Sequence, residues 1–265
     1  MQPIQLATVL PGADRFSEGN VNATFRGQIL LSDGSVQGAI LKDLDARQLA
    51  NELIVSALAK HVGLPTPDSY LALVRNGDLS LAAAPALPDG NQIVFASVDV
   101  KAPNITFRIR TAPPEQHGRL MKEILEWRYL GGLYGFDAWV ANIDRHPGNL
   151  LFGKNGEFWL IDHGHCFSGP RWTGADLKSD GNYINRLSQW LTSEMSDNQK
   201  KKRLDEVFSK TKDFASIDIS SIENNTWVVY LLNKNEALAL SRFLDGRIEH
   251  VPLHASAALG MGLLV

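Results

Sequence analysis

Three oxygen-bearing side chains follow one another in a fixed order in the middle of the chain. Asp144 and Asn149 stand five residues apart, and Asp162 comes thirteen residues after Asn149, at the end of the apolar run Phe158–Ile161. A carboxylate can accept the proton of an attacking hydroxyl, and a carboxylate with an amide oxygen can hold Mg²⁺. Asp144 fits the first role, and Asn149 with Asp162 fits the second. Each alone could fill a turn, but together they predict phosphoryl transfer.

A lysine and a glutamate upstream supply further charges that such chemistry needs. Lys42 ends the apolar run Ala39–Leu41 and is one of only two lysines in the first hundred residues. The other, Lys60, lies at the end of an expected helix, where the helix dipole alone explains a cation. Glu52 follows Lys42 by ten residues, beside the expected core-facing stripe of that helix. A strand lysine fixed by a helix carboxylate predicts a contact between Lys42 and the phosphates of ATP.

A phosphate cradle is the least distinct part of the pattern. Phe16–Val21 precedes the first long strand, so its backbone N–H groups, including those of Ser17 and Gly19, could face phosphates. The segment has one glycine and lacks the spacing G-x-G-x-x-G. A plain β-turn is an equally good interpretation.

The elements that must position these residues begin with strands and one helix. Asp45 has capping-box spacing to Gln48, and Gly63 ends the clearest helix of the chain. One apolar stripe follows this helix at 3.6-residue spacing, formed by Leu49, Leu53, Ala57 and Leu58. The expected strands cover residues 22–31, 36–41, 70–74 and 92–98, the first two as a hairpin.

Beyond Pro103 the pattern becomes mainly helical. A compact hairpin at 150–152 and 158–161 brings Asn149 and Asp162 to one end of two short strands. The expected helices cover residues 116–130, 133–140, 184–191, 197–209, 220–232 and 235–243. We therefore expect an α+β fold, with a small antiparallel-sheet lobe that holds one helix and a larger helical lobe.

The order of motifs resembles the HipA-like kinases and their relatives in the phosphoinositide 3-/4-kinase branch of the protein-kinase-like fold. D-R-H-x-x-N-L-L followed by I-D-x-G carries the resemblance over Asn142–Gly164, and Gly19–Pro67 agrees more loosely. It implies a bilobal protein-kinase-like fold, with residues 1–100 as a nucleotide-covering lobe and 101–265 as a helical catalytic lobe. It also implies a kinase that uses ATP and Mg²⁺.

The resemblance assigns roles to individual residues. Asp144 is the implied catalytic base, Asn149 and Asp162 the Mg²⁺ ligands, and Lys42 the phosphate contact that Glu52 orients. Arg145 and His146 support the catalytic loop, and adenine is expected against the family's hinge in Val94–Asp99. The implied nucleotide contacts are Ser17, Gly19, Lys42, Phe95, Ala96, Ser97 and Val98.

Two departures limit what the resemblance implies. The order Asp-Arg-His differs from the His-Arg-Asp of ordinary protein kinases, so their substrate rules do not transfer. The chain is also shorter than a full-length HipA toxin, which has an extra N-terminal subdomain, so a toxin role is not implied. We expect a Ser or Thr hydroxyl on a protein as the acceptor, the chain itself included, with a small alcohol as the alternative. Candidate autophosphorylation sites are Ser168, Thr173 and Ser179.

Two other functions remain open. A non-catalytic, nucleotide-binding pseudokinase would keep the fold without the reaction. A metal-dependent hydrolase would instead use a cluster of Asp, His and Cys residues. Within it, His163 and His165 form an H-x-H pair, and such pairs bind transition metals. Its residues are Asp144, His146, Asp162, His163, His165 and Cys166.

Composition excludes several other classes of protein. The 265 residues are 44% hydrophobic, which excludes a mainly disordered chain, and they fit one large domain or two small ones. With 26 Lys and Arg against 29 Asp and Glu, the chain lacks the basic excess of a general nucleic-acid binder. One cysteine excludes an internal disulfide.

No signal peptide or membrane-spanning run is visible in the sequence. Residues 251–265 are expected to dock on the body of the protein. We therefore expect a cytoplasmic protein. The oligomeric state is left open.

Overall fold

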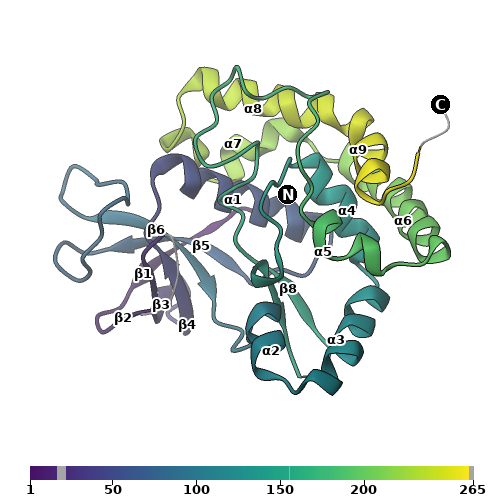
Figure 1. The fold of residues 1–265 in the computed structure, drawn as a ribbon. Helices are drawn as coiled ribbons and strands as arrows, with labels where there is room; N and C mark the ends of the chain where they lie inside the picture. Colours follow the sequence, from purple (N-terminus) through teal and green to yellow (C-terminus); the bar gives the residue numbers. More distant parts are fainter. Residues whose placement is uncertain (17–21, 155, 263–265) are drawn as a thin grey trace.

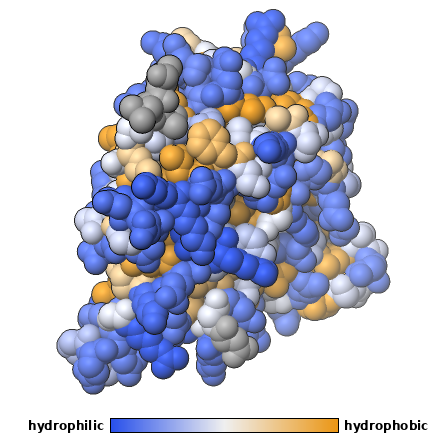
Figure 2. Space-filling view, turned by 90° about the vertical axis from the view of Figure 1, so that its right-hand side faces the viewer, coloured by the Kyte–Doolittle hydropathy of each residue, from blue (hydrophilic) through white to orange (hydrophobic). Residues whose placement is uncertain are grey.

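The structure, a computed structural model, describes residues 1–16, 22–154 and 156–262. It is a mixed α+β fold with a sheet-rich N-terminal part and a helical C-terminal part (Figure 1). Polar residues cover most of the face drawn in Figure 2, and apolar side chains reach the surface in smaller patches between them. No helix in the described ranges is long and apolar enough to cross a membrane.

The N-terminal sheet closes on itself. Its strand order is β1-β5-β6-β4-β3-β2, and a further antiparallel pairing of β1 with β3 makes it barrel-like, with β2 at the edge. The strands are β1 (Gln5–Val9), β2 (Asp14–Arg15), β3 (Thr24–Leu31), β4 (Val36–Lys42), β5 (Ser69–Val74) and β6 (Gln92–Val98). The predicted hairpin and the two later strands are confirmed, whereas β1 and β2 were not predicted.

Helix α1 (Ala46–His61) lies between the sheet and the C-terminal helices (Figure 1). Asp45 caps it, because its side chain accepts hydrogen bonds from the backbone N–H groups of Arg47 and Gln48. Three residues of the predicted stripe, Leu49, Leu53 and Ala57, pack on the sheet with Phe95, whereas Leu58 belongs to the larger core with the C-terminal helices. The opposite side is also buried, because all twelve residues from 48 to 59 are at most 9% exposed. The helix therefore belongs to two cores instead of covering one.

Eight further α-helices follow β6 in the described part of the chain. They are α2 (Ile105–Thr111), α3 (Pro114–Glu126), α4 (Leu130–Trp139), α5 (Leu187–Trp190), α6 (Asp197–Ala215), α7 (Ile222–Asn225), α8 (Lys234–Arg247) and α9 (Val251–Ala258). The short strands β7 (Leu150–Phe152) and β8 (Phe158–Leu160) form the predicted hairpin. The predicted helix at 220–232 is wrong, because left-handed backbone at Trp227 (φ 61°) stops α7 from continuing. In the C-terminal segment that was expected to dock, α9 packs against α4 and α6, and residues 263–265 lie outside the described residues.

Buried α4 packs closely on α6. A Cβ atom at Gly131 would lie 2.6 Å from the carbonyl oxygen of Arg203, so only glycine allows this approach. The close packing fixes α4, whose last turn leads directly into the loop of Asp144.

Candidate active site

Lys42 joins three elements that are far apart in sequence. Its Nζ donates to Glu52 Oε1 on α1 at 2.5 Å and to Asp162 Oδ1, just after β8, at 3.0 Å. The side chain of Lys42 is 14% exposed, that of Glu52 1% and that of Asp162 49%. Glu52 Oε2 also accepts the backbone N–H of His163 at 3.0 Å. Lys42, Glu52 and Asp162, predicted separately, therefore form one charged cluster.

Lys42 and Asp162 hold each other in their ionised forms, whereas the pKa of Glu52 is raised. Burial works against the ammonium of Lys42, but Asp162 and Glu52 outweigh it and raise its pKa above the ordinary value. Partial burial works to raise the pKa of Asp162, yet Lys42 lowers it to about 2. Burial is the largest influence on Glu52 and raises its pKa, with Lys42 opposing. Lys42 and Asp162 therefore keep opposite charges at neutral pH.

Asn149 and Asp162 lie on neighbouring backbone. The backbone N–H of Ile161 donates to the carbonyl oxygen of Asn149 at 3.2 Å, so the chain enters Asp162 beside Asn149. Asp162 has left-handed backbone (φ 61°), a conformation that Asp tolerates better than most residues. Asn149 Nδ2 donates to the backbone oxygen of Asp144 at 2.8 Å. Asn149 Oδ1 accepts no hydrogen bond from the described residues, so amide and carboxylate oxygens are available there, which suits Mg²⁺.

Arg145 is a buried brace beneath this loop. Its guanidinium is fully buried and pairs with both carboxylate oxygens of Asp137, at 3.0 and 3.2 Å. It also donates to the carbonyl oxygens of Asn149 (3.1 Å), a candidate metal ligand, and of Ile161 (2.8 Å), which precedes the other, Asp162. Burial raises the pKa of Asp137, and Arg145 opposes that effect. Arg145 therefore holds the backbone next to Asn149 and Asp162 in place, and its burial keeps it from contacting a substrate.

Residues not singled out from sequence complete the site. Asp137 could have been found from the sequence, because it is the one charged residue in the apolar segment that forms α4. Asn51, beside Glu52 on α1, donates to the carbonyl oxygen of Gly164 at 2.9 Å and accepts from Trp172 Nε1 at 2.9 Å. Arg186 contacts the carboxylate of Asp144. Asn51 and Arg186 carried no local signal, because their partners are distant in sequence.

The histidines of the site point in different directions. His146 and His165 are partly exposed and each lies 3.8 Å from Asp144 Oδ2. His163 is buried, with Nδ1 3.2 Å from Arg145 Nη2, and burial lowers its pKa well below the ordinary value. Cys166 is fully buried, which raises the pKa of its thiol. Among the described residues, no three His, Cys, Asp or Glu side chains are grouped so as to hold a metal ion.

The expected nucleotide contacts meet different outcomes. Ser17 and Gly19 lie outside the described residues. Phe95, Ala96 and Ser97 lie in β6 and pair with β4 on one side and β5 on the other, so their backbone is used within the sheet. Val98 pairs with β4, and its N–H donates to a carbonyl that precedes β5. The next N–H, that of Asp99, still donates to the carbonyl oxygen of Gly38 in β4 at 2.9 Å, so backbone free of the strand ladder begins after Asp99.

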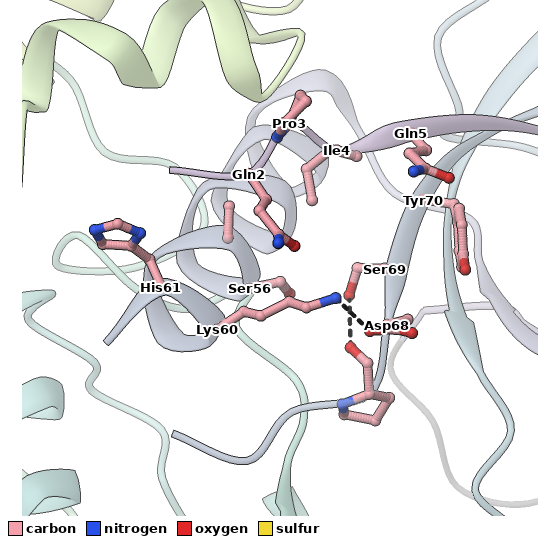
Figure 3. Close-up of a pocket in the computed structure, with 12 residues that line it drawn as sticks. Gln2, Pro3, Ile4, Gln5, Ser56, Lys60, His61, Asp68, Ser69 and Tyr70 are labelled. Atoms are coloured by element: carbon pink, nitrogen blue, oxygen red, sulfur yellow. Dashed lines mark hydrogen bonds and ion pairs between the residues drawn. The ribbon is translucent and has the colours of Figure 1, made fainter. Parts of the chain in front are cut away.

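A surface hollow of about 360 Å³ lies away from this cluster (Figure 3). It is bounded by the start of β1, the last turns of α1 and the start of β5. Lys60 Nζ and Asp68 Oδ1 lie 2.5 Å apart in its wall. None of the residues of the charged cluster lines it, so it is separate from the candidate active site.

A comparison with protein families gives one match. The family model described as HipA-like kinase matches residues 32–222, which include β4, α1, the hairpin and Arg186. A comparison with curated proteins gives no match.

Proposed function

The chain belongs to the HipA-like kinase family, and from this premise we propose that it transfers the γ-phosphoryl group of ATP to a Ser or Thr hydroxyl of a protein. The family itself indicates a kinase-type phosphotransferase. The use of ATP with Mg²⁺, the class of acceptor and the roles below are parts of the proposal.

The observation that carries the proposal is the bridge made by Lys42. A lysine held between Glu52 and Asp162 brings a phosphate-binding cation to within 3.0 Å of a candidate metal ligand. Kinases need both charges in place at the same time. A structural ion pair alone gives no reason for Asp162 to keep a half-exposed carboxylate next to the backbone of Asn149, whose Oδ1 accepts no hydrogen bond from the described residues.

In this proposal, residues 1–100 form the nucleotide-covering lobe and 101–265 the catalytic lobe of a bilobal kinase-like fold. Adenine binds near the backbone that follows Asp99, because β6 is paired on both sides and the N–H of Asp99 still donates to β4. Lys42 binds the phosphates, and Asp144 orients and deprotonates the acceptor hydroxyl. Asn149 and Asp162 hold Mg²⁺, which when bound neutralises charge on the phosphates.

The experiment is phosphorylation with ATP and Mg²⁺, read by mass spectrometry, first with the protein alone and then with a cell lysate. We expect Asp144→Asn to lose transfer but retain ATP binding, and Asp162→Asn to lose transfer while the protein stays folded in thermal melting. Asp68→Asn, an exposed carboxylate in the separate hollow, is the matched control and should keep full activity. Full activity in Asp144→Asn would show that the base is assigned wrongly.

The same protein distinguishes the alternatives. A pseudokinase would bind ATP without transferring phosphate to any protein or small alcohol. A metal-dependent hydrolase would retain stoichiometric zinc or iron after dialysis. Either result would replace the proposed function.

A further inference from the structure

Three side chains that can carry positive charge surround the carboxylate of Asp144. Arg186 Nη1 contacts Oδ1, and His146 Nε2 and His165 Nδ1 each lie 3.8 Å from Oδ2. The side chain of Arg186 is 41% exposed and that of Asp144 24%. Arg186 supplies a guanidinium, a group that is always protonated in proteins. It is therefore the permanent cation at the candidate base.

The backbone at Arg186 is fixed to the site on both sides. Asn185 is buried, and its Nδ2 donates to the carbonyl oxygen of Tyr134 on α4 at 3.4 Å. Trp190 Nε1 donates at 3.2 Å to the carbonyl oxygen of Arg145, the residue after the candidate base. The segment is thus held against α4 and the catalytic loop, while the exposed guanidinium can change its partner.

The geometry of phosphoryl transfer places the reacting phosphate within reach of this guanidinium. An acceptor hydroxyl lies about 2.6–3.2 Å from its base, and the phosphorus about 3–3.5 Å from the hydroxyl oxygen. A group that touches Asp144 is therefore within a few ångström of the γ-phosphoryl oxygens. These oxygens carry negative charge, and Lys42 is already bound by two carboxylates. In addition to the proposed Mg²⁺, a cation on the Asp144 side would offset the repulsion between that carboxylate and the phosphoryl oxygens.

We propose that Arg186 contacts the γ-phosphoryl group and stabilises its charge during transfer, an inference that rests on the proposed function. When nucleotide binds, Arg186 leaves Asp144 Oδ1 for the phosphoryl oxygens, and the carboxylate becomes available to the hydroxyl. The bond from the acceptor oxygen to phosphorus forms while the bond from phosphorus to the β–γ bridging oxygen breaks. The hydroxyl proton passes to Asp144, and ADP leaves with the electron pair of the broken bond.

The test compares a nucleotide that has a γ-phosphate with one that lacks it. Dissociation constants of ADP and of the β,γ-imido analogue of ATP are measured by titration calorimetry with Mg²⁺. We expect Arg186→Met to weaken binding of the analogue at least about tenfold and to lower kcat about 10²- to 10³-fold. ADP affinity should stay within about twofold, and Arg186→Lys should restore part of the loss. Arg171→Met, an exposed arginine in the preceding loop, is the matched control and should match the wild type.

Each other outcome overturns this role. An unchanged ratio of the two affinities in Arg186→Met excludes a contact with the γ-phosphate, even if kcat falls. If that variant does not fold, the ratio in Arg186→Lys decides, and wild-type values in it count against the role. A wild type that binds both nucleotides and phosphorylates, with unchanged ratios in the variants, leaves the proposed function intact. A wild type that binds neither nucleotide overturns both.

Discussion

Lys42 joins two carboxylates in very different surroundings. Glu52 is buried and Asp162 is half-exposed, although the same ammonium contacts both. Water can replace Lys42 at Asp162, but the surroundings of Glu52 offer only the N–H of His163 as another donor among the described residues. Loss of the lysine therefore costs more at the buried end of the bridge.

Lys42→Met should abolish phosphorylation and also lower the free energy of unfolding by about 3 kcal/mol, because it leaves a buried carboxylate without its cation. Denaturant unfolding followed by tryptophan fluorescence measures the loss. The double variant Lys42→Met/Glu52→Gln should recover much of the stability and none of the activity, because the buried charge is gone. A double variant no more stable than the single one would contradict this account.

The pair of Asp137 and Arg145 is fully buried on both sides. Asp137→Asn removes one charge and leaves a guanidinium without a counter-ion, so the free energy of unfolding should fall by about 3–5 kcal/mol. The control is Asp213→Asn, which breaks an exposed pair with Lys210 and should change stability by less than about 0.5 kcal/mol. If the two variants lost the same free energy of unfolding in urea, Asp137 would not be the counter-ion that stabilises buried Arg145.

Residue types and spacing were enough to find the residues that form the charged cluster. Lys42, Glu52 and Asp162 each had an unusual place: a charge after an apolar strand, or a carboxylate beside a core-facing stripe. Arg186 had none, because an arginine in a polar loop is ordinary until the fold brings it to Asp144, forty-two residues earlier. Its role depends on a tertiary contact that no local pattern encodes.

At the scale of elements, α1 fixes the segment that follows Asp162. Glu52 accepts the N–H of His163, and Asn51 holds the carbonyl oxygen of Gly164 and the indole N–H of Trp172. One turn of helix therefore carries both the partner of Lys42 and the anchor of the loop beyond the hairpin.

Asn51→Ala should loosen this segment, because it leaves a buried indole N–H and a carbonyl oxygen without partners. We expect a loss of about 2 kcal/mol in the free energy of unfolding. Hydrogen exchange should become faster in residues 163–172 and stay unchanged in the strands. Lys60→Ala, which removes an exposed ion pair from the same helix, should affect neither measurement. Unchanged exchange in Asn51→Ala would exclude the anchor role.

Elements with strong local patterns were predicted and those that depend on distant partners were not. Capping at Asp45 and the two hairpins are local signals, and all three appear in the structure. The short strand β1 owes its place to a parallel pairing with β5, more than sixty residues later, and its antiparallel pairing with β3 closes the sheet. The break at Trp227 has no proline or glycine to mark it.

At the scale of the whole molecule, His254 on α9 gives a pH dependence to folding. Its Nε2 is buried without a hydrogen-bond partner among the described residues, and burial, with Arg247 and His250, lowers its pKa to about 4. The unfolded chain takes up a proton below its ordinary pKa near 6.5, whereas the folded chain does so only near 4. The contribution of His254 to stability is therefore fully present above about pH 6.5 and is lost as the pH falls toward 4.

His254→Gln should flatten this part of the pH profile. Between pH 7.5 and 5.5 the wild type should lose about 1 kcal/mol more than the variant, a value reduced because the ring is only half-buried. Urea unfolding at the two pH values measures the difference. Parallel losses in wild type and variant would assign the pH dependence to other groups.

Helix α1 is buried on every side from residue 48 to 59. A helix with one exposed face tolerates substitutions with a period of 3.6 residues, because every third or fourth position faces water. This helix has no such positions, so a saturation mutagenesis profile should show a continuous intolerant block across those twelve residues. Its pattern of tolerated substitutions would then resemble that of an interior strand of a parallel sheet, which is also buried on both faces, although the segment is a helix between two cores.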